Sequence, residues 1–577
     1  MVNSSENVKR QISLDLLNPR GVLPSTPVTG LSNPRITDLS GKRIALLSDK
    51  PMAGYFFDIF EELLKEKYPT VTILRFPSSD APDTPDNTEE VASQCDAWIQ
   101  GIKTSGLSPM DSEVKLEKFG KPGVAFTADN LLDQRRWLAE DSGISTLRIL
   151  PLPTEAIYSC ENLPEKIRPI VTSVFDATIE ALTSPLTEAE KNPKPAVRDY
   201  GLIKITGNSY NEVIENFQQY CADNKMGDGL PLIPPTREVV EWMLTGTNRS
   251  PDEEIGRMAT RNGMATIEKI AINAVMAGAK PEYLPVIIAA IECLADKSFN
   301  LYHLQNSAAS PSALIWVNGP ITQEIGMNSR LGYLGPGCRA NSAIGRAISL
   351  CMINIGWRFV GGVSNLTGVP EGYCNLIFPE NEKDSPWESF AVEHGYRPED
   401  STVTINECFS YNRFGPGTVM NPQPMGKLLN NLADIIAGTR MGSSSRYCQI
   451  ALYPAFARQL ATAGYTKQSL IQWLCENSRV PWENLSQEQK NTAKDAALGG
   501  KIPGLKLEDC KPGGSVPSFT NPKHMAILVA GDMGGYTVVF HSAIGSASIN
   551  ADNPDAPAGI DFMTKRIHGA TLTKAGR

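Results

Sequence analysis

Histidine is scarce in this sequence of 577 residues, and its cysteines are scattered. There are 5 histidines, no two of them close together, and the 11 cysteines include no C-x-x-C pair. A structural zinc site needs four such ligands, usually at short spacings, and a disulfide framework is typical of small secreted chains. We therefore expect no metal, no cofactor and no disulfide framework.

The sequence also lacks an excess of positive charge and any long apolar run. Its formal net charge is −9, whereas a chain that binds nucleic acid usually presents a basic face. No apolar segment approaches the roughly 18 residues that a membrane-spanning helix needs, and the N-terminus lacks the apolar core of a secretory signal. These absences predict a cytoplasmic protein without nucleic-acid or membrane partners.

Residues 42–152 show a regular alternation of strand and helix patterns. The strand-like runs are KRIALLSD, TVTILRF, CDAWIQGI, KPGVAFTA and STLRILPLP. Strands that alternate with helices indicate parallel β-α-β units, so we expect a doubly wound, mainly parallel sheet. The first strand is not followed by G-x-G-x-x-G, which argues against a dinucleotide site there.

The rest of the chain divides into less regular parts, and its length predicts two or three domains. We expect a poorly ordered leader at 1–41, a helical connector at 153–205 and a larger mixed α/β domain at 206–577. An exposed insertion is expected near 484–520, where Lys, Gln, Gly and Pro are frequent. No internal repeat is evident. The predicted fold class is α/β throughout.

Four phrases of the sequence are distinctive: GDGLPLIPPT, WVNGPITQEIGMNS, GPGCRANSAIGRA and ENEKDSPWE. In these phrases the sequence resembles the UGSC family, whose members carry a selenocysteine or cysteine motif in an N-terminal α/β domain. The resemblance runs over most of residues 42–545 and is dense from 227 to 405. It implies an architecture and names no reaction.

The sequence departs from the family motif at the positions that matter for redox chemistry. Ser105 stands where the resemblance implies the selenol or thiol, and Ser108 stands at the second cysteine. Hydroxyl groups do not form selenenylsulfides or disulfides. We therefore expect non-redox chemistry, with Ser105 as a hydrogen-bond donor in a pocket, or a non-catalytic paralogue that partners an intact UGSC-type protein.

A Gly-Pro-Gly turn precedes a helical pattern at 334–348. The N–H groups of such a turn and of the helix start attract carboxylate or phosphate groups, and nearby basic and amide side chains would add to this. The expected binding residues are Gly335, Gly337, Arg339, Asn341 and Arg346. The same surroundings would activate Cys338 as a nucleophile, although a buried cysteine is also a common small apolar filler.

Three further residues are candidates for proton transfer. Glu382 lies in PENEKDSPWE, Asp228 in GDGLP and His303 in LYHLQNS. Carboxylates and histidine carry protons when a cleft tunes them. The alternatives are a solvated loop for Glu382, a turn for Asp228 and a structural histidine. Asn318 and Asn328 are expected to line the same pocket.

Together these features favour an enzyme of small-molecule or secondary metabolism that acts by acid–base chemistry on a compact polar or carboxylated substrate. A lyase, an isomerase or a condensing enzyme fits this description. One alternative is a covalent thiol transferase that uses Cys338, and another is the non-catalytic partner subunit. A homodimer is expected because most soluble oligomers are symmetric dimers.

Two substitutions separate ligand holding from thiol attack at this turn. If the turn holds an anion, Cys338→Ser should leave turnover largely intact, because serine keeps the backbone donor. Arg339→Ala should then lower kcat/KM by a factor that corresponds to a loss of about 1.5–3 kcal/mol of transition-state stabilisation, the range of a charge-assisted hydrogen bond. Steady-state kinetics with the natural substrate would check this. An inactive serine variant beside a nearly unaffected alanine variant would instead identify Cys338 as the nucleophile.

Overall fold

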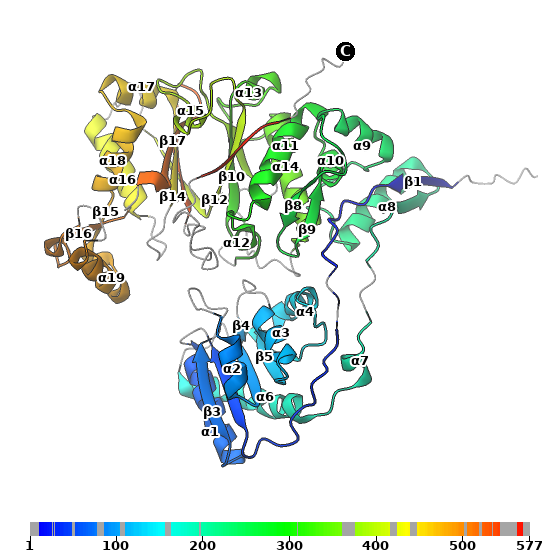
Figure 1. Cartoon of the computed structure of the whole chain (residues 1–577). Helices are drawn as coiled ribbons and strands as arrows, with labels where there is room; N and C mark the ends of the chain where they lie inside the picture. Colours follow the sequence, from blue (N-terminus) through cyan, green and yellow to red (C-terminus); the bar gives the residue numbers. More distant parts are fainter. Residues whose placement is uncertain are drawn as a thin grey trace, which may run out of the picture.

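The structure is a computed structural model (Figure 1). It describes residues 11–25, 27, 29–48, 52–77, 86–103, 110–155, 163–194, 198–307, 310–359, 375–415, 424–438, 447–500, 505–518, 522–533, 535–542 and 562–568. Ser105 and Ser108 lie outside these residues. The described chain contains a sheet near its N-terminus and two four-stranded sheets further along, with helices around each.

The N-terminal sheet has five strands that all run parallel. In the order of the sheet they are β3 (Thr72–Pro77), β2 (Arg43–Ser48), β4 (Ala97–Lys103), β5 (Gly123–Ala128) and β6 (Ile149–Leu152). Numbered within this domain the order is 2-1-3-4-5, one of the two common doubly wound arrangements. In such sheets the chain reverses its direction of winding between the first and third strands, here β2 and β4.

Helices cover both faces of this sheet, as the alternating pattern predicted. One face carries α1 (Met52–Lys67) and α6 (Pro164–Thr183), and the other carries α2 (Thr88–Gln94), α3 (Asp111–Lys118) and α4 (Leu132–Asp141). All six residues of β5, GVAFTA, are buried, with Phe126 on the side of α1 and Ala125 on the other. The prediction of a doubly wound parallel sheet is confirmed.

Two segments that we expected to lie outside the domains are built into the fold. Strand β1 (Ile12–Leu16), within the predicted leader, pairs antiparallel with β7 (Ile203–Gly207). The prediction of a poorly ordered leader is therefore wrong for β1, because its backbone is hydrogen-bonded to a strand almost 200 positions further along the chain. Helix α6, within the predicted connector, packs on the N-terminal sheet, and α7 (Glu188–Lys191), α8 (Tyr210–Asp223) and α9 (Arg237–Leu244) follow it.

The C-terminal part contains two sheets of four strands. The first has the order β11 (Leu376–Pro379), β10 (Ser312–Asn318), β12 (Thr402–Cys408), β19 (Met563–Arg566). The second has the order β17 (Met525–Val529), β14 (Tyr447–Leu452), β18 (Thr537–Ser542), β13 (Ser410–Phe414). In each, a central strand has one parallel and one antiparallel neighbour, followed by an outer antiparallel strand.

The two sheets are thus structural repeats that exchange their outer strands. Strand β13 follows β12 in the chain but pairs with β18 of the second sheet, whereas β19 follows β18 but pairs with β12 of the first. The sequence shows no repeat because strand order and direction are kept here without similar residues. Each half of the C-terminal part therefore completes the sheet of the other half.

The two sheets pack face to face, with helices on the outside (Figure 1). Alternate residues of the strands, including Leu314, Trp316, Phe378, Leu528 and Phe540, form one apolar cluster between the sheets. The opposite face of the first sheet packs on α10 (Ile267–Met276), α11 (Leu284–Ala295) and α14 (Arg339–Asn354). The opposite face of the second packs on α16 (Met425–Gly438), α17 (Pro454–Thr462) and α18 (Lys467–Asn477). Strands buried on both faces explain the apolar runs of these segments.

Shorter elements complete the C-terminal part. They are the hairpin β8 (Glu254–Met258) and β9 (Gly263–Thr266), the helices α12 (Leu301–Asn306), α13 (Ile321–Glu324) and α15 (Phe390–Glu393), and, around the predicted insertion, β15 (Arg479–Pro481), α19 (Gln487–Leu498) and β16 (Ser515–Pro517). Of the helices in the described ranges, none has the length and apolar character that crossing a membrane requires.

The contact between the sheets can be tested at Trp316. Its side chain is fully buried, and its ring centroid lies 5.1 Å from that of Phe390 and 5.6 Å from that of Phe562. We expect Trp316→Ala to lower the free energy of unfolding by about 3–5 kcal/mol, the usual cost of emptying such a site. Trp242→Ala, at a half-exposed position on α9, is the control and should change it by about 0.5 kcal/mol or less. Urea unfolding would measure both, and equal effects would contradict the packing argument.

Candidate functional site

The N-terminal sheet presents the carboxyl ends of its strands to the C-terminal part. Helix α4 follows the end of β5, and Gln134 in its first turn donates from Nε2 to Oδ1 of Asn306 on α12 at 2.9 Å. The Arg261 side chain, from the β8–β9 hairpin, forms an ion pair with Asp141 at 2.7 Å. Figure 1 shows α12 above this edge of the sheet. Because doubly wound domains bind ligands beyond the carboxyl ends of their strands, this interface is a natural binding position.

A buried histidine–carboxylate pair lies on the C-terminal side of this interface. Nδ1 of His303, on α12, lies 3.1 Å from Oε2 of Glu407, on β12. Oε1 of Glu407 accepts a hydrogen bond of 2.9 Å from the Ser542 hydroxyl, at the end of β18. His303 is 3% exposed and Glu407 is 8% exposed. The two C-terminal sheets thus each contribute one partner to the chain Ser542–Glu407–His303.

The second ring nitrogen of His303, Nε2, is buried and has no hydrogen-bond partner among the described residues. When Glu407 is ionised, its carboxylate can only accept, so the proton of the neutral imidazole is held on Nδ1. The lone pair is then on Nε2. A buried polar atom without a partner is uncommon and calls for an explanation. A histidine oriented by a carboxylate, with a free lone pair on the other nitrogen, has the arrangement of a general base.

Glu382 lies at the far end of the first sheet. Its Oε1 accepts from Nδ2 of Asn318 at 2.8 Å and from the backbone N–H of Gly319 at 2.9 Å. Gly319 adopts φ +89°, and a Cβ at this position would lie 2.2 Å from the carbonyl oxygen of Asp400, so only glycine fits. Burial raises the pKa of Glu382, and these two hydrogen bonds only partly oppose the effect. Glu382 and Asn318, two of the candidate residues, are therefore hydrogen-bonded to each other.

A buried ion network adjoins Glu382. Nδ2 of Asn318 also donates to Glu380 at 2.7 Å, and the Lys467 ammonium lies 3.3 Å from Glu380 and 2.9 Å from Glu393. Burial alone would lower the pKa of Lys467, but the two carboxylates raise it above its usual value. Lys467 therefore stays charged. Its ammonium group forms ion pairs with both Glu380 and Glu393.

The Gly-Pro-Gly turn leads into α14 as the sequence predicted. Cys338 is the N-cap residue of the helix, and its thiol donates weakly to the Gly326 carbonyl at 3.4 Å and to Oδ1 of Asn341 at 3.3 Å. Asn341 in turn donates to the carbonyl oxygens of Asn328 and Tyr333. Gly337 has φ +113°. The amide of Asn341 thus fixes the loop before the helix, and Asn328 belongs to the same cluster.

The two arginines of the predicted anion site point to protein groups. Arg346 forms two hydrogen bonds with the carboxylate of Asp228, at 2.7 and 2.9 Å. Arg339 donates to the carbonyl oxygen of Gly278 at 2.9 Å. Because Asp228 neutralises Arg346, this pair ties the GDGLP segment to α14, and each residue is the other's partner.

The candidate residues are therefore not in one place. Strand β10 has seven residues, which span about 20 Å, and the His303–Glu407 pair lies near its start whereas Asn318 and Glu382 lie at its end. Asn328, Asn341 and Cys338 lie on the segment that follows this end. Glu382 and His303 therefore lie too far apart in this fold to act together in one pocket.

Two residues of the interface site escaped the sequence reasoning. Glu407 interrupts the apolar strand TVTINEC, and an acidic residue in a buried strand was the signal that could have drawn attention to it. Ser542 gave no signal. Among the residues that the structure describes, no three histidine, cysteine or carboxylate side chains form a group able to hold a metal ion.

The N-terminal sheet and the helices that cover both of its faces define a doubly wound α/β domain. Residues 15–184 match the sequence model of the UGSC family, and this part of the chain is a UGSC family domain. The match ends one residue after α6, so it includes the helix that we had assigned to a connector. No sequence among the curated proteins matches the chain. The resemblance expected at 227–405 lies outside the matched residues and stays a prediction.

The raised pKa of Glu382 can be tested through stability. A carboxyl group whose pKa is raised on folding binds its proton more tightly in the folded state, so stability falls as the pH rises through and above the ordinary range near 4.3. Glu382→Gln removes this loss and should gain stability relative to the parent between pH 4 and pH 7. Urea unfolding at four pH values would measure the difference, with Glu388→Gln, an exposed neighbour, as the control. A stability difference between Glu382→Gln and the parent that is the same at every pH would contradict a raised pKa of Glu382.

Proposed function

We propose that the chain is a non-redox enzyme that moves protons on a compact polar or carboxylated substrate, as a lyase, an isomerase or a condensing enzyme does. Its site is the interface between the UGSC domain and the C-terminal sheets. His303 is the general base, Glu407 orients it, and Ser542 holds Glu407. Small-molecule sites occur preferentially at such interfaces between domains.

The observation that carries the proposal is the buried Nε2 of His303, which has no partner in the part of the chain that the structure describes, beside an oriented Nδ1. A structural histidine would be expected to use both nitrogens, because leaving one unsatisfied costs about 1–3 kcal/mol. A substrate with an acidic proton supplies the missing partner. After proton transfer the imidazolium carries a positive charge, which the nearby Glu407 carboxylate stabilises.

The UGSC domain supports this assignment from the other side of the interface. The residues that the resemblance assigns to the family motif follow Lys103, the last residue of β4, in the sequence, and β4 borders the point where the winding of the sheet reverses. The resemblance implies that Ser105 stands where the motif's redox residue is expected. Ser105 then serves as a hydrogen-bond donor to the substrate, and the chemistry moves from a thiol to the histidine.

A comparison of a knockout strain with its parent would find the substrate, and variants would test the site. We expect a metabolite to accumulate in the knockout strain and purified protein to consume it. His303→Gln should lower kcat by about 10²–10⁴-fold, the usual contribution of a general base, and Glu407→Gln should also lower it because the imidazole loses its orienting partner. Turnover in D₂O should place deuterium on the substrate or product.

His394→Gln is the matched control for this experiment. His394 lies on the segment after α15 and bonds through Nδ1 to the Phe390 carbonyl, at 2.8 Å. This variant should keep full activity, and thermal unfolding of all three variants would show that the fold is intact. A folded His303→Gln variant with unchanged kcat would refute the proposal. A parent protein that consumes no accumulated metabolite unless a UGSC-type partner is added would favour the non-catalytic subunit.

The thiol alternative keeps one observation in its favour. Cys338 is half-buried, whereas the other described cysteines are buried. A covalent transferase that uses Cys338 would work at the start of α14, on the segment that follows the end of β10, whereas the His303–Glu407 pair lies near the start of β10. Under this alternative, stoichiometric alkylation of Cys338 at pH 7 abolishes turnover and His303→Gln leaves kcat unchanged. The proposal expects instead that alkylation of Cys338 leaves turnover intact and that His303→Gln lowers kcat.

A further inference from the structure

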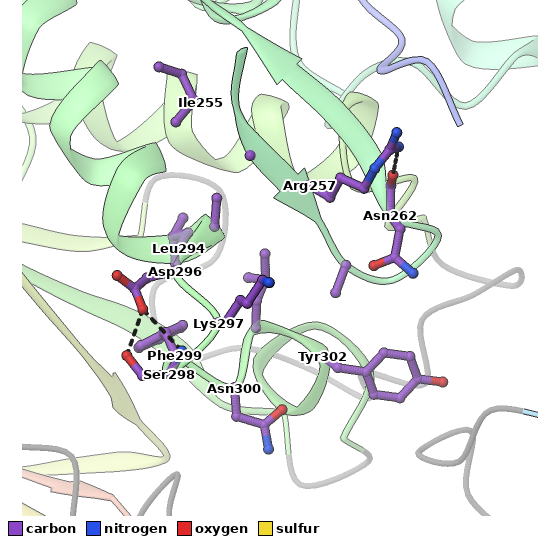
Figure 2. Close-up of a pocket in the computed structure, with 14 residues that line it drawn as sticks. Ile255, Arg257, Asn262, Leu294, Asp296, Lys297, Ser298, Phe299, Asn300 and Tyr302 are labelled. Carbon is purple, nitrogen blue, oxygen red and sulfur yellow. Dashed lines mark hydrogen bonds between the residues drawn. The ribbon is translucent and has the colours of Figure 1, made fainter. Parts of the chain in front are cut away.

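A cavity of about 820 Å³ lies beside α12, between the β8–β9 hairpin and the segment that joins α11 to α12. Figure 2 shows its walls: Ile255, Arg257 and Asn262 come from the hairpin, and Leu294 to Tyr302 come from the other side. Sites for small molecules have volumes of about 300–1,000 Å³. None of the candidate residues predicted from the sequence lines this cavity.

The charged side chains that line the cavity differ in whether an opposite charge neutralises them. Asp296 is neutralised by Lys565 at 2.7 Å and also accepts from Ser298. Among the described residues Arg257 has no acidic partner, and its guanidinium donates a hydrogen bond to the Asn262 carbonyl at 2.9 Å. Lys297 has no ion pair with a described residue, and Figure 2 shows its side chain extending toward the hairpin. The cavity therefore presents two positive charges that no described carboxylate offsets.

The remaining walls are largely apolar. Ile255 and Phe299 are half-buried, and Leu294 is fully buried at the base of the helix α11. An apolar surface of this kind gains free energy when a hydrocarbon or aromatic body covers it. The side-chain amides of Asn262 and Asn300 add polar groups at the edge. Two cations beside an apolar wall suit a molecule with a negative group at one end and an apolar body at the other.

We propose that this cavity binds a small anion with an apolar body, such as an aryl or alkyl carboxylate or phosphate. Lys297 and Arg257 hold the anionic group, and Ile255 and Phe299 contact the apolar body. The site is separate from the proposed proton-transfer site, since His303 does not line the cavity, and it stands on its own observations.

Calorimetric titration of the full chain at low ionic strength would test this site with three probes of similar shape. Benzoate and phenyl phosphate carry the two anionic groups, and benzamide is the neutral counterpart. We expect at least one anion to bind at one site per chain and about tenfold more tightly than benzamide, as one charge-assisted hydrogen bond predicts. Whichever of benzoate and phenyl phosphate binds more tightly indicates whether the natural ligand carries a carboxylate or a phosphate.

Single substitutions would show which residues bind the anion. Lys297→Gln and Arg257→Gln should each weaken the preferred anion about tenfold, while Lys204→Gln, at an exposed lysine on β7, should not change its affinity. All three side chains are exposed, so the fold should tolerate these changes. His303→Gln should bind the anion as the parent does, which separates this test from that of the proton-transfer site. Equal affinity for benzoate, phenyl phosphate and benzamide would overturn the proposal, and so would equal losses in Lys297→Gln and Lys204→Gln.

Discussion

The apolar contact between the two C-terminal sheets is the interaction on which the candidate chemistry depends. Trp316, Phe378 and Phe540 exclude water between the sheets, and this packing fixes the distance between strands β12 and β18. Because the strands are held at that distance, the Ser542 hydroxyl reaches the Glu407 carboxylate, and Glu407 reaches His303. A loosened core would leave the same residues present without the alignment that proton transfer needs.

In the proposed site, the UGSC domain and the C-terminal sheets have different roles. A doubly wound domain supplies a loop beyond the carboxyl edge of its strands, where a substrate can be held. The C-terminal sheets supply a buried, oriented titratable group. Arg261 with Asp141 and Gln134 with Asn306 tie the two parts together. In the proposed function, the reactive group is a histidine of the C-terminal part, and the UGSC domain lies across the interface from it.

Local sequence patterns predicted the secondary structure well. The strand-like runs of residues 42–152 became the five parallel strands β2 to β6. Periodicity succeeds there because burial on a strand or helix face repeats at a fixed spacing. It failed for β1, whose hydrogen-bonded partner β7 is remote in the chain.

The candidate site was less predictable, for physical reasons. Asn318 and Glu382 were both noticed, since each follows a strand that ends in a polar turn. Glu407 and Ser542 were missed because their pairing depends on how two sheets stack, which no local pattern encodes. Arg346 and Asp228 were read as functional, but a sequence does not reveal that two opposite charges 118 positions apart satisfy each other.

The exchange of outer strands also bears on synthesis. The first sheet gains its last strand, β19, from residues 563–566, about 150 positions after β12 has emerged. During synthesis, the edge of β12 therefore stays unpaired until the ribosome has released residues 563–566. Until then, the hydrogen-bonding groups along that edge are open to other chains, a state that favours association between nascent proteins. The separation in sequence of two strands that are neighbours in space thus sets how long one sheet edge is exposed during synthesis.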